Sequence, residues 1–409
     1  MVLFARAMVV SLASMRLVIL DPGHFHASLL QREMYPSIDP HVSVYAPLGP
    51  EVLDYLQRVW RFNARPDSPT AWQLDLRLAP DSFPAMLRDR PGDIVVFAGR
   101  NRGKIDRILA CLQAGLHVLA DKPWIISSAD LPQLQAALRL AEERNLVAYD
   151  IMTERYEVTS QLQREFVSDP SVFGQLQSVR ARSIHHIMKS VAGAPLRRPA
   201  WFFDIVEYGE GLADVGTHVV DLVPWTAFPD QPMAPSDIRI HAARRWPLTL
   251  TPEQFTQVTG EARQENLDYY CNNAVEYTIR GVPVSLEILW HWEAPSGRGD
   301  LYEASFRGTQ ATVEIRQEAM PELYITPASE AAQRKVAALQ ACWPGLGAEQ
   351  SAGALRLAIP SRFRVGHEQH FAQVAARFLE YVQAPQSMPS WVNPNMLAKY
   401  FVTTKGVEL

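Results

Sequence analysis

The sequence has few cysteines, no long apolar run and no excess of positive charge, and each shortage excludes a class of protein. Its three cysteines, Cys111, Cys271 and Cys342, lie far apart and outside any Cys-x-x-Cys or Cys/His metal spacing, so we expect reduced thiols in a cytoplasmic chain and no metal site. No stretch reaches the roughly 18 apolar residues of a membrane span. The net charge of −5 argues against nucleic acid or an anionic membrane as a partner.

What is present is the composition of a globular protein. Hydrophobic residues make up 47% and charged residues 20% of the chain, which is ordinary for a protein with a sizeable core. A length of 409 residues predicts two or three domains. Residues 1–14 are apolar with one charge, Arg6, and end in Ala13-Ser14. They resemble a short signal peptide, but Met15 stands directly before the first strand, which favours a start site placed too far upstream.

Short apolar runs alternate with helical patterns as far as residue 150. Buried parallel strands are predicted at 17–20, 41–45, 93–98, 117–120 and 147–149. Helix faces lie between them, including one that begins at Ala27 and one that stops at Gly115. This alternation predicts a doubly wound parallel sheet, a Rossmann domain, over residues 15–150.

The pattern changes in residues 151–409. Apolar residues alternate with period two at 275–279, 284–292, 302–306 and 311–315. These runs predict an antiparallel meander, and helices are expected near 160–167 and 371–381. Long polar joins are expected at 228–236, 251–266 and 327–352. The second half is therefore predicted to be an α+β domain.

The turn after the first strand, Leu20 to Ala27, is the first candidate site. A dinucleotide-binding fold needs a tight turn here, whose backbone approaches a pyrophosphate at the start of a helix. The fingerprint G-x-G-x-x-G keeps only its middle glycine, Gly23, while Asp21 and His26 occupy the outer positions. A polar strand-to-helix connection also explains the turn, as does a metal held by Asp21, His24 and His26.

Two further motifs place ionisable side chains where ligands bind. Asp121-Lys122-Pro123 ends the predicted strand 117–120, at the sheet edge that binds ligands in open α/β folds. In a helix, Asp214, His218 and Asp221 would share one face, and a histidine flanked by carboxylates suits proton transfer. Each motif also has a structural explanation, as a solvated charge pair or as a capped helix start with a core histidine.

Together and in this order, the three motifs resemble the Gfo/Idh/MocA family of oxidoreductases. That family has a glycine-rich first turn, an acid-Lys-Pro motif, and a Gly-x-x-x-Asp-x-Gly-x-His-x-x-Asp segment, which residues 211–221 match. Arg155-Tyr156 and the segment His367 to Phe371 are also similar to the family. The resemblance covers the chain from Met15 onward. It implies a Rossmann domain, a second domain (151–409) with a large, mostly antiparallel open sheet, and a homo-oligomer, either dimer or tetramer.

The resemblance also implies a reaction: hydride transfer between NAD or NADP and a hydroxyl or ketone of a sugar, a cyclitol or a derivative. NAD is the family default. Lys122 would bind the reacting oxygen, His218 would be the principal acid/base, and Asp214 would hold the substrate and orient the histidine. The implied substrate-binding residues are Lys122, Arg155, His185, Asp214 and His218. The implied cofactor-binding residues are Gly23, His24, Phe25, His26, Gly99, Arg100, Asn101, Asp121, Lys122 and Pro123. Pro123 is expected to follow a cis peptide bond, as in family members.

Several departures from the family leave alternatives open. Two fingerprint glycines are missing, Asp21 would bring negative charge to a pyrophosphate, and Tyr45-Ala46-Pro47 provides neither an acid for ribose hydroxyls nor an arginine for the NADP phosphate. The first alternative is a glycosidase or lyase that oxidises its sugar transiently with tightly held NAD. The second is a non-catalytic ligand-binding protein on the same fold.

Overall fold

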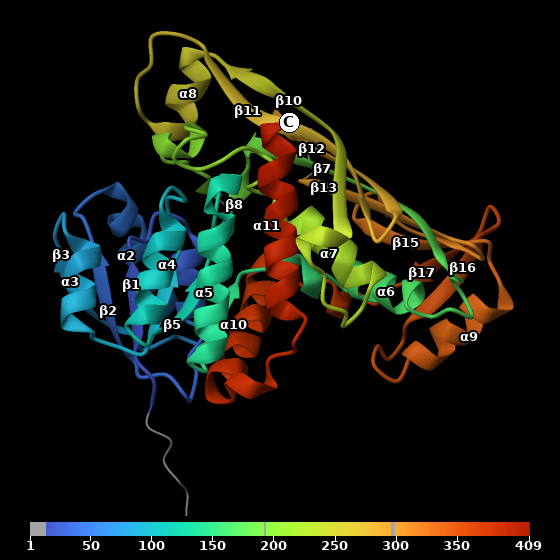
Figure 1. The fold of residues 1–409 in the computed structure, drawn as a ribbon, viewed down its shortest axis with the longest axis horizontal. Coiled ribbons are helices and arrows are strands. Elements are labelled where there is room, and N and C mark those ends of the chain that lie inside the picture. Colours follow the sequence, from blue (N-terminus) through green and yellow to red (C-terminus); the bar gives the residue numbers. More distant parts are fainter. Residues whose placement is uncertain (1–13, 192–193, 296–298) are drawn as a thin grey trace, which may run out of the picture.

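The computed structural model describes residues 14–191, 194–295 and 299–409. The two interpretations of the N-terminal segment concern residues that, apart from Ser14, lie outside this range. The chain builds two sheets, which lie in separate parts of the molecule (Figure 1). Within the described ranges, no helix has the length and apolar character needed to cross a membrane.

The first sheet is entirely parallel, with the strand order β3-β2-β1-β4-β5-β6. Its strands are β1 (Leu17–Leu20), β2 (His41–Ala46), β3 (Gln73–Leu78), β4 (Ile94–Phe97), β5 (His117–Ala120) and β6 (Ala148–Asp150). The connecting helices are α1 (His26–Leu29), α2 (Pro50–Ala64), α3 (Ser82–Asp89), α4 (Lys104–Gln113) and α5 (Leu131–Glu143). The order reverses between β1 and β4, so the ligand crevice of this topology lies at their carboxyl ends. The predicted Rossmann fold is confirmed.

The second sheet has nine strands in the order β10-β11-β12-β7-β13-β14-β15-β17-β16. Their bounds are β7 (Leu176–Met188), β10 (Ile238–Leu250), β11 (Leu267–Ile279), β12 (Val282–Glu293), β13 (Leu301–Gly308), β14 (Thr312–Gln317), β15 (Pro321–Thr326), β16 (Gly347–Ser351) and β17 (Ala354–Ala358). A separate small ribbon pairs β8 (Ser190–Val191) with β9 (Ala194–Pro195). The helices of this half are α6 (Val158–Val167), α7 (Gly216–Ala227), α8 (Pro252–Thr259), α9 (Glu330–Leu339), α10 (His367–Gln383) and α11 (Val392–Glu408).

The large antiparallel sheet is confirmed, but the expected meander is wrong in one respect. Strand β7 lies between β12 and β13 and pairs parallel with β12. The period-two pattern indicates which residues of a strand face the core, but it does not indicate the order of the strands in the sheet. The polar joins are also not plain loops, since 251–266 contains α8 and 327–352 contains α9 and β16.

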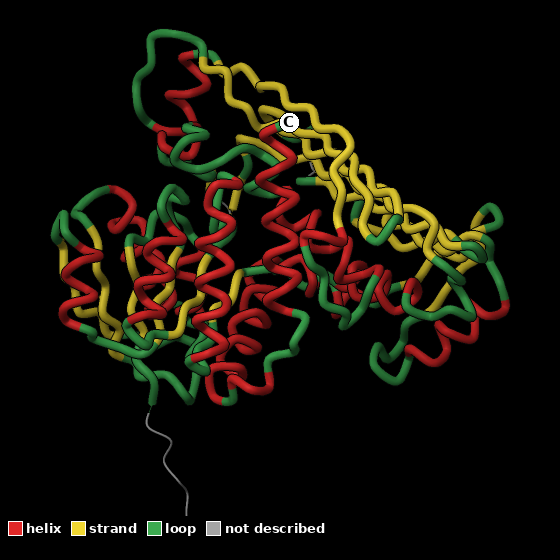
Figure 2. The backbone as a smooth tube through the Cα atoms, in the orientation of Figure 1, coloured by secondary structure: helices red, strands yellow, loops and turns green. Residues whose placement is uncertain are grey.

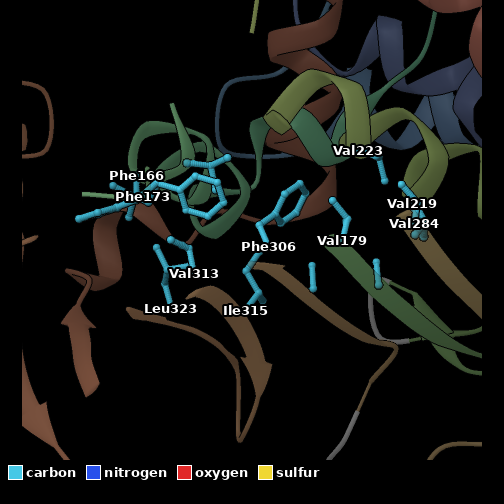
Figure 3. Close-up of a cluster of buried hydrophobic side chains, with 14 of the residues drawn as sticks. Phe166, Phe173, Val179, Val219, Val223, Val284, Phe306, Val313, Ile315 and Leu323 are labelled. Atoms are coloured by element: carbon cyan, nitrogen blue, oxygen red, sulfur yellow. The ribbon is translucent and has the colours of Figure 1, made fainter. Parts of the chain in front are cut away.

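Helices gather on one face of the second sheet, as Figure 2 shows. Between α6, α7 and the strands lies a cluster of buried apolar side chains (Figure 3). Phe166 of α6 and Val219 of α7 meet Phe306 and Val313 of the sheet in this cluster. Apolar and polar residues alternate along β12 and β13, so the apolar side chains of both strands point from one face of the sheet into this cluster.

The C-terminal helices complete the core of the first sheet. Phe371, Val374 and Phe378 of α10 pack in one cluster with Leu17 and Ile19 of β1. Helix α11 runs between the two halves (Figure 1), where it contacts α5, α7 and β10. The last residues of the chain therefore belong structurally to both halves. The domain boundary at residue 150 stays a prediction.

Candidate active site

The turn after β1 neutralises the charge that the sequence introduces there. Asp21 has a left-handed backbone conformation (φ 44°). Its carboxylate accepts hydrogen bonds from Ser82 (2.7 Å) and Arg107 (2.9 Å). An acid at the first fingerprint position is therefore offset by a cation. With these partners, Asp21 is not the metal ligand that its spacing to His24 and His26 suggested.

A cleft of about 720 Å³ opens at the carboxyl ends of β1, β2 and β4. Gly23 and Gly99, both expected at the cofactor, line it together with Arg100, Arg102 and Arg107. A side chain at Gly99 would lie 2.7 Å from the Asp21 carbonyl oxygen, so only glycine lets the β1 and β4 turns approach this closely. The cleft combines exposed main chain with guanidinium groups, a combination that suits phosphate.

A segment of the second half covers one side of this cleft. The Trp201 indole lies over Gly23, where an added Cβ would meet it at 3.0 Å. Its Nε1 donates to Glu51 (3.1 Å), and the Arg100 guanidinium lies 5.1 Å from the ring centroid. Further along, the Glu207 carbonyl accepts hydrogen bonds from the backbone of residues 101 and 102. Glu51 places a carboxylate in the cleft, although no acid follows β2 directly.

Asn101 and Lys104 hold the loop that follows β5. Asn101 is buried, and its side-chain amide donates to the Tyr208 carbonyl (2.6 Å). Lys104 donates to the carbonyl oxygens of Asp121 (2.9 Å) and Pro123 (3.1 Å). Burial lowers the pKa of Lys104 to about 8. The peptide bond before Pro123 is cis, as expected. Asn101 thus contacts protein groups that shape the site.

Lys122 and Asp214 form a buried ion pair that joins the two halves of the molecule. The Lys122 ammonium donates to Asp214, which also accepts a hydrogen bond from the Tyr208 hydroxyl (3.0 Å). All three residues are at least nine-tenths buried. Burial alone would raise the pKa of Asp214, but the charge and hydrogen bond of Lys122 bring it below its ordinary value. Two predicted catalytic residues are therefore in direct contact.

His218 lies on α7 and is uncharged near neutral pH. Burial, and then the positive charge of Lys122, lower its pKa well below the ordinary value of 6.5. Its Nδ1 is buried and has no hydrogen-bond partner among the described residues. Because α7 begins at Gly216, Asp214 precedes the helix. The condition for a shared helix face is therefore met by His218 and Asp221 but not by Asp214, whose carboxylate accepts hydrogen bonds from Lys122 and Tyr208.

The neutral state of His218 predicts acid sensitivity. In the unfolded chain this histidine takes up a proton as the pH falls through about 6.5, whereas the folded state does not. Stability is therefore complete above pH 6.5 and falls below it, by up to about 1.4 kcal/mol per pH unit for this group. We expect urea unfolding at pH 7.0 and 5.5 to show this fall. His218→Asn cannot titrate and should show a smaller one, and equal pH dependence in both proteins would contradict the burial argument.

The remaining turn residues converge on Asp121. Nδ1 of His24 lies 2.9 Å from one carboxylate oxygen of Asp121, and Nδ1 of His26 lies 3.0 Å from the other. Burial, and next the charge of His26, lower the pKa of His24 to about 4. Phe25 packs edge-on against His26. Of the predicted cofactor residues, these four form a cluster at the base of the turn.

Two predicted substrate residues have partners of their own. Arg155 makes a bidentate ion pair with Asp221 (2.6 and 2.7 Å). Lys399 of α11 bridges Asp221 (3.0 Å) to Asp150 (2.6 Å). His185 lies 3.3 Å from Asp300, which also contacts His186 (3.1 Å). A substrate role for Arg155 and His185 stays a prediction, since each is engaged within the protein.

Tyr208, Glu51 and His367 were not singled out as site residues by the sequence. Tyr208 comes from an irregular segment with no motif. Glu51 follows β2 at a distance rather than at its end. His367 begins α10, and its Nε2 lies 2.8 Å from Nε2 of His26. Its segment did carry a signal, His367 to Phe371, but that signal indicated only the start of a helix.

Comparisons with known proteins agree with this architecture. A family model described as "Putative oxidoreductase C terminal domain" matches residues 162–409, more than half of the chain. A crystal structure of a "putative oxidoreductase" from Parabacteroides merdae is 37% identical, with a TM-score of 0.93 over 97% of this chain and 98% of that one. No curated protein matches the sequence.

More distant structures share the fold. Levoglucosan dehydrogenase, in complex with NADH and L-sorbose, is 15% identical with a TM-score of 0.63 over 96% of each chain. KijD10, a 3-ketoreductase from Actinomadura kijaniata in complex with TDP-benzene and NADP, is 16% identical with a TM-score of 0.58 over 96% of this chain and 97% of that one. On the family model and the Parabacteroides structure, the chain belongs to the Gfo/Idh/MocA family of oxidoreductases, as its motifs predict.

Proposed function

We propose that the protein transfers a hydride between a nicotinamide dinucleotide and a hydroxyl or ketone of a sugar-like molecule. The observation that carries this proposal is the buried cluster of Lys122, Asp214 and Tyr208. The cluster lies next to the cleft, because Lys104, which lines the cleft, donates a hydrogen bond to the loop that contains Lys122. The complexes of the two distant structures with dinucleotides and sugar-like ligands support the same conclusion.

The residues of the cleft fit a dinucleotide. Gly23 and Gly99 place main chain at the cleft, where a pyrophosphate would lie. The guanidinium groups of Arg100 and Arg102 line the same space, each paired with a carboxylate, Glu51 (3.5 Å) and Glu207 (3.0 Å). Arg107 offsets the charge of Asp21. Glu51 offers a carboxylate to ribose hydroxyls and would repel a 2′-phosphate, so we propose NAD over NADP. When bound, the nicotinamide accepts or donates the hydride.

The surrounding side chains manage the proton. Oxidation of a carbinol carbon requires the hydroxyl proton to leave as the hydride departs, and the neutral imidazole of His218 is able to accept it. The Lys122 ammonium stabilises the alkoxide that develops on the reacting oxygen. Asp214 and Tyr208 fix the position of that ammonium. In the reductive direction the same groups return the proton.

The test begins with the cofactor. Nucleotide released from the denatured protein is identified by mass spectrometry, and the stripped protein is titrated with NAD and NADP by calorimetry. We expect NAD to bind more tightly than NADP, and a panel of sugars to give net NADH. Turnover without net NADH would indicate transient oxidation instead, and absence of binding at millimolar cofactor would overturn the proposal.

Gly23→Ala tests whether the turn accepts the pyrophosphate. The added methyl group narrows the approach to the main chain beneath Trp201, so we expect NAD to bind about tenfold more weakly, a loss of about 1.4 kcal/mol. Gly347→Ala in β16 is the matched control, because its Cβ would meet only ordinary contact at 3.6 Å. Unchanged affinity in Gly23→Ala would place the cofactor elsewhere.

A further inference from the structure

We infer that His24, His26 and Asp121 form a binding site for one divalent transition-metal ion. Their donor atoms, one from each residue, lie within 4.8 Å of one another. Two imidazoles and a carboxylate are a donor set that zinc and ferrous iron both use in proteins. The sequence pointed to Asp21 as the third ligand, because Asp121 lies far from the two histidines in the chain.

Both histidines of the cluster lie at ion-pair distance from Asp121 but make no aligned hydrogen bond with it. Nδ1 of both histidines and Oδ1 of Asp121 are buried and have no hydrogen-bond partner among the described residues. The N···O separations of 2.9 and 3.0 Å are short, so the groups approach closely without being aligned as donor and acceptor. Buried polar atoms of this kind are rare unless something else satisfies them.

The distances suit an ion after a small adjustment. Zinc–ligand bonds of about 2.0–2.2 Å at tetrahedral angles separate neighbouring donor atoms by about 3.3–3.6 Å. The two close N···O pairs would therefore open by a few tenths of an ångström, and any wider donor pair, up to 4.8 Å, would close. Three protein donors leave a fourth position for water or for an oxygen of a bound ligand.

His367 supplies the outer partner that metal-binding histidines require. Its Nε2 lies 2.8 Å from Nε2 of His26, on the side of the ring opposite Nδ1. A proton on Nε2 of His26, donated to His367, leaves Nδ1 free to bind the metal, and such contacts fix the ring orientation. Lys104 fixes the main chain of Asp121 by donating a hydrogen bond to its carbonyl oxygen (2.9 Å).

The position of the cluster suggests what the ion does. His26 occupies the third fingerprint position, where a glycine normally allows close packing of helix and strand. An ion shared with Asp121 would fasten the first turn to the end of β5, next to Lys122. The turn would then be held by coordination instead of by glycine packing.

The test measures the metal itself, without nucleotide or substrate. The protein is purified without metal-affinity chromatography, and its bound metals are identified by mass spectrometry. It is then stripped with a chelator and titrated with Zn²⁺ alone. We expect about one ion per chain and a higher Tm with Zn²⁺. His24→Gln, His26→Ala and Asp121→Asn should each weaken Zn²⁺ binding more than about 100-fold, and His367→Ala about 10- to 100-fold.

His41→Ala is the matched control, because His41 is an exposed histidine outside the cluster and should not change binding. His24→Gln keeps the proposal testable if the more buried variants fail to fold, since His24 is the most exposed of the three. A stripped protein that binds no Zn²⁺, or variants that bind it like the wild type, would overturn the inference. Neither result depends on whether NAD binds.

Discussion

Replacement of Lys122 by methionine is expected to lower kcat by about 10²–10⁴-fold on whichever sugar the panel identifies, because it removes the cation beside the reacting oxygen. NAD binding should stay close to wild type, since the cleft is lined by other residues. The measurement is steady-state kinetics together with calorimetry of NAD. Kinetics and calorimetry together separate a chemical defect from a loss of cofactor, and urea denaturation measures the destabilisation that the unpaired Asp214 causes.

Two further variants sharpen that result. Lys405→Met on the exposed side of α11 has the same change in chemistry and should leave kcat unchanged. Lys122→Arg keeps the charge near Asp214 but displaces the donor atoms, so it should retain the fold and recover little activity. Full activity in Lys122→Met would remove this residue from the mechanism.

Lys399→Met is expected to lower the free energy of unfolding by about 3–5 kcal/mol, because it leaves two buried carboxylates short of a partner. The Lys399 side chain is 1% exposed, and it contacts Asp150 and Asp221. Burial opposes ionisation of Asp221, but the charges of Arg155 and Lys399 lower its pKa below the ordinary value. Asp221 is therefore charged in the folded protein at pH 7.

Urea denaturation provides the measurement, with Lys405→Met on the same helix as control and an expected change of no more than about 0.5 kcal/mol. The double variant Lys399→Met/Asp150→Asn should recover part of the loss, since the second change removes one of the two carboxyl groups that lost Lys399 as a partner. If Lys399→Met lowers the free energy of unfolding by less than about 1 kcal/mol, water must reach the carboxylates of Asp150 and Asp221 in the folded protein.

The first sheet was largely predictable because its central strands are continuous buried runs. The edge strand β3 was missed although Gln73 to Leu78 alternates polar residues with leucines as a strand does. Five of its six residues are exposed, so it lacks the buried apolar run that marks the central strands. Helix α11 was missed for a different reason. It is buried on several sides, with Asn395, Lys399 and Thr403 satisfied by internal partners, so it has no single apolar face.

Prediction of the site followed the same division. Gly23, Asp121 and Lys122 stand at strand ends, where topology alone brings ligands. The contacts of Tyr208 with Asp214 and of His367 with His26 join segments distant in the chain, and no local pattern specifies them. The ion pair of Arg155 with Asp221 also joins distant segments, and Lys399 of α11, a helix that the sequence did not reveal, contacts the same carboxylate.

The packing of α10 on β1 has a consequence for how the protein is made. Phe371, Val374 and Phe378 fill the core beside the first strand, so the first sheet emerges from the ribosome long before one wall of its core exists. Completion of the Rossmann half must wait until α10 has been synthesised. We therefore expect a fragment of residues 15–150 to be poorly soluble on its own, and co-expression with the rest of the chain to restore it.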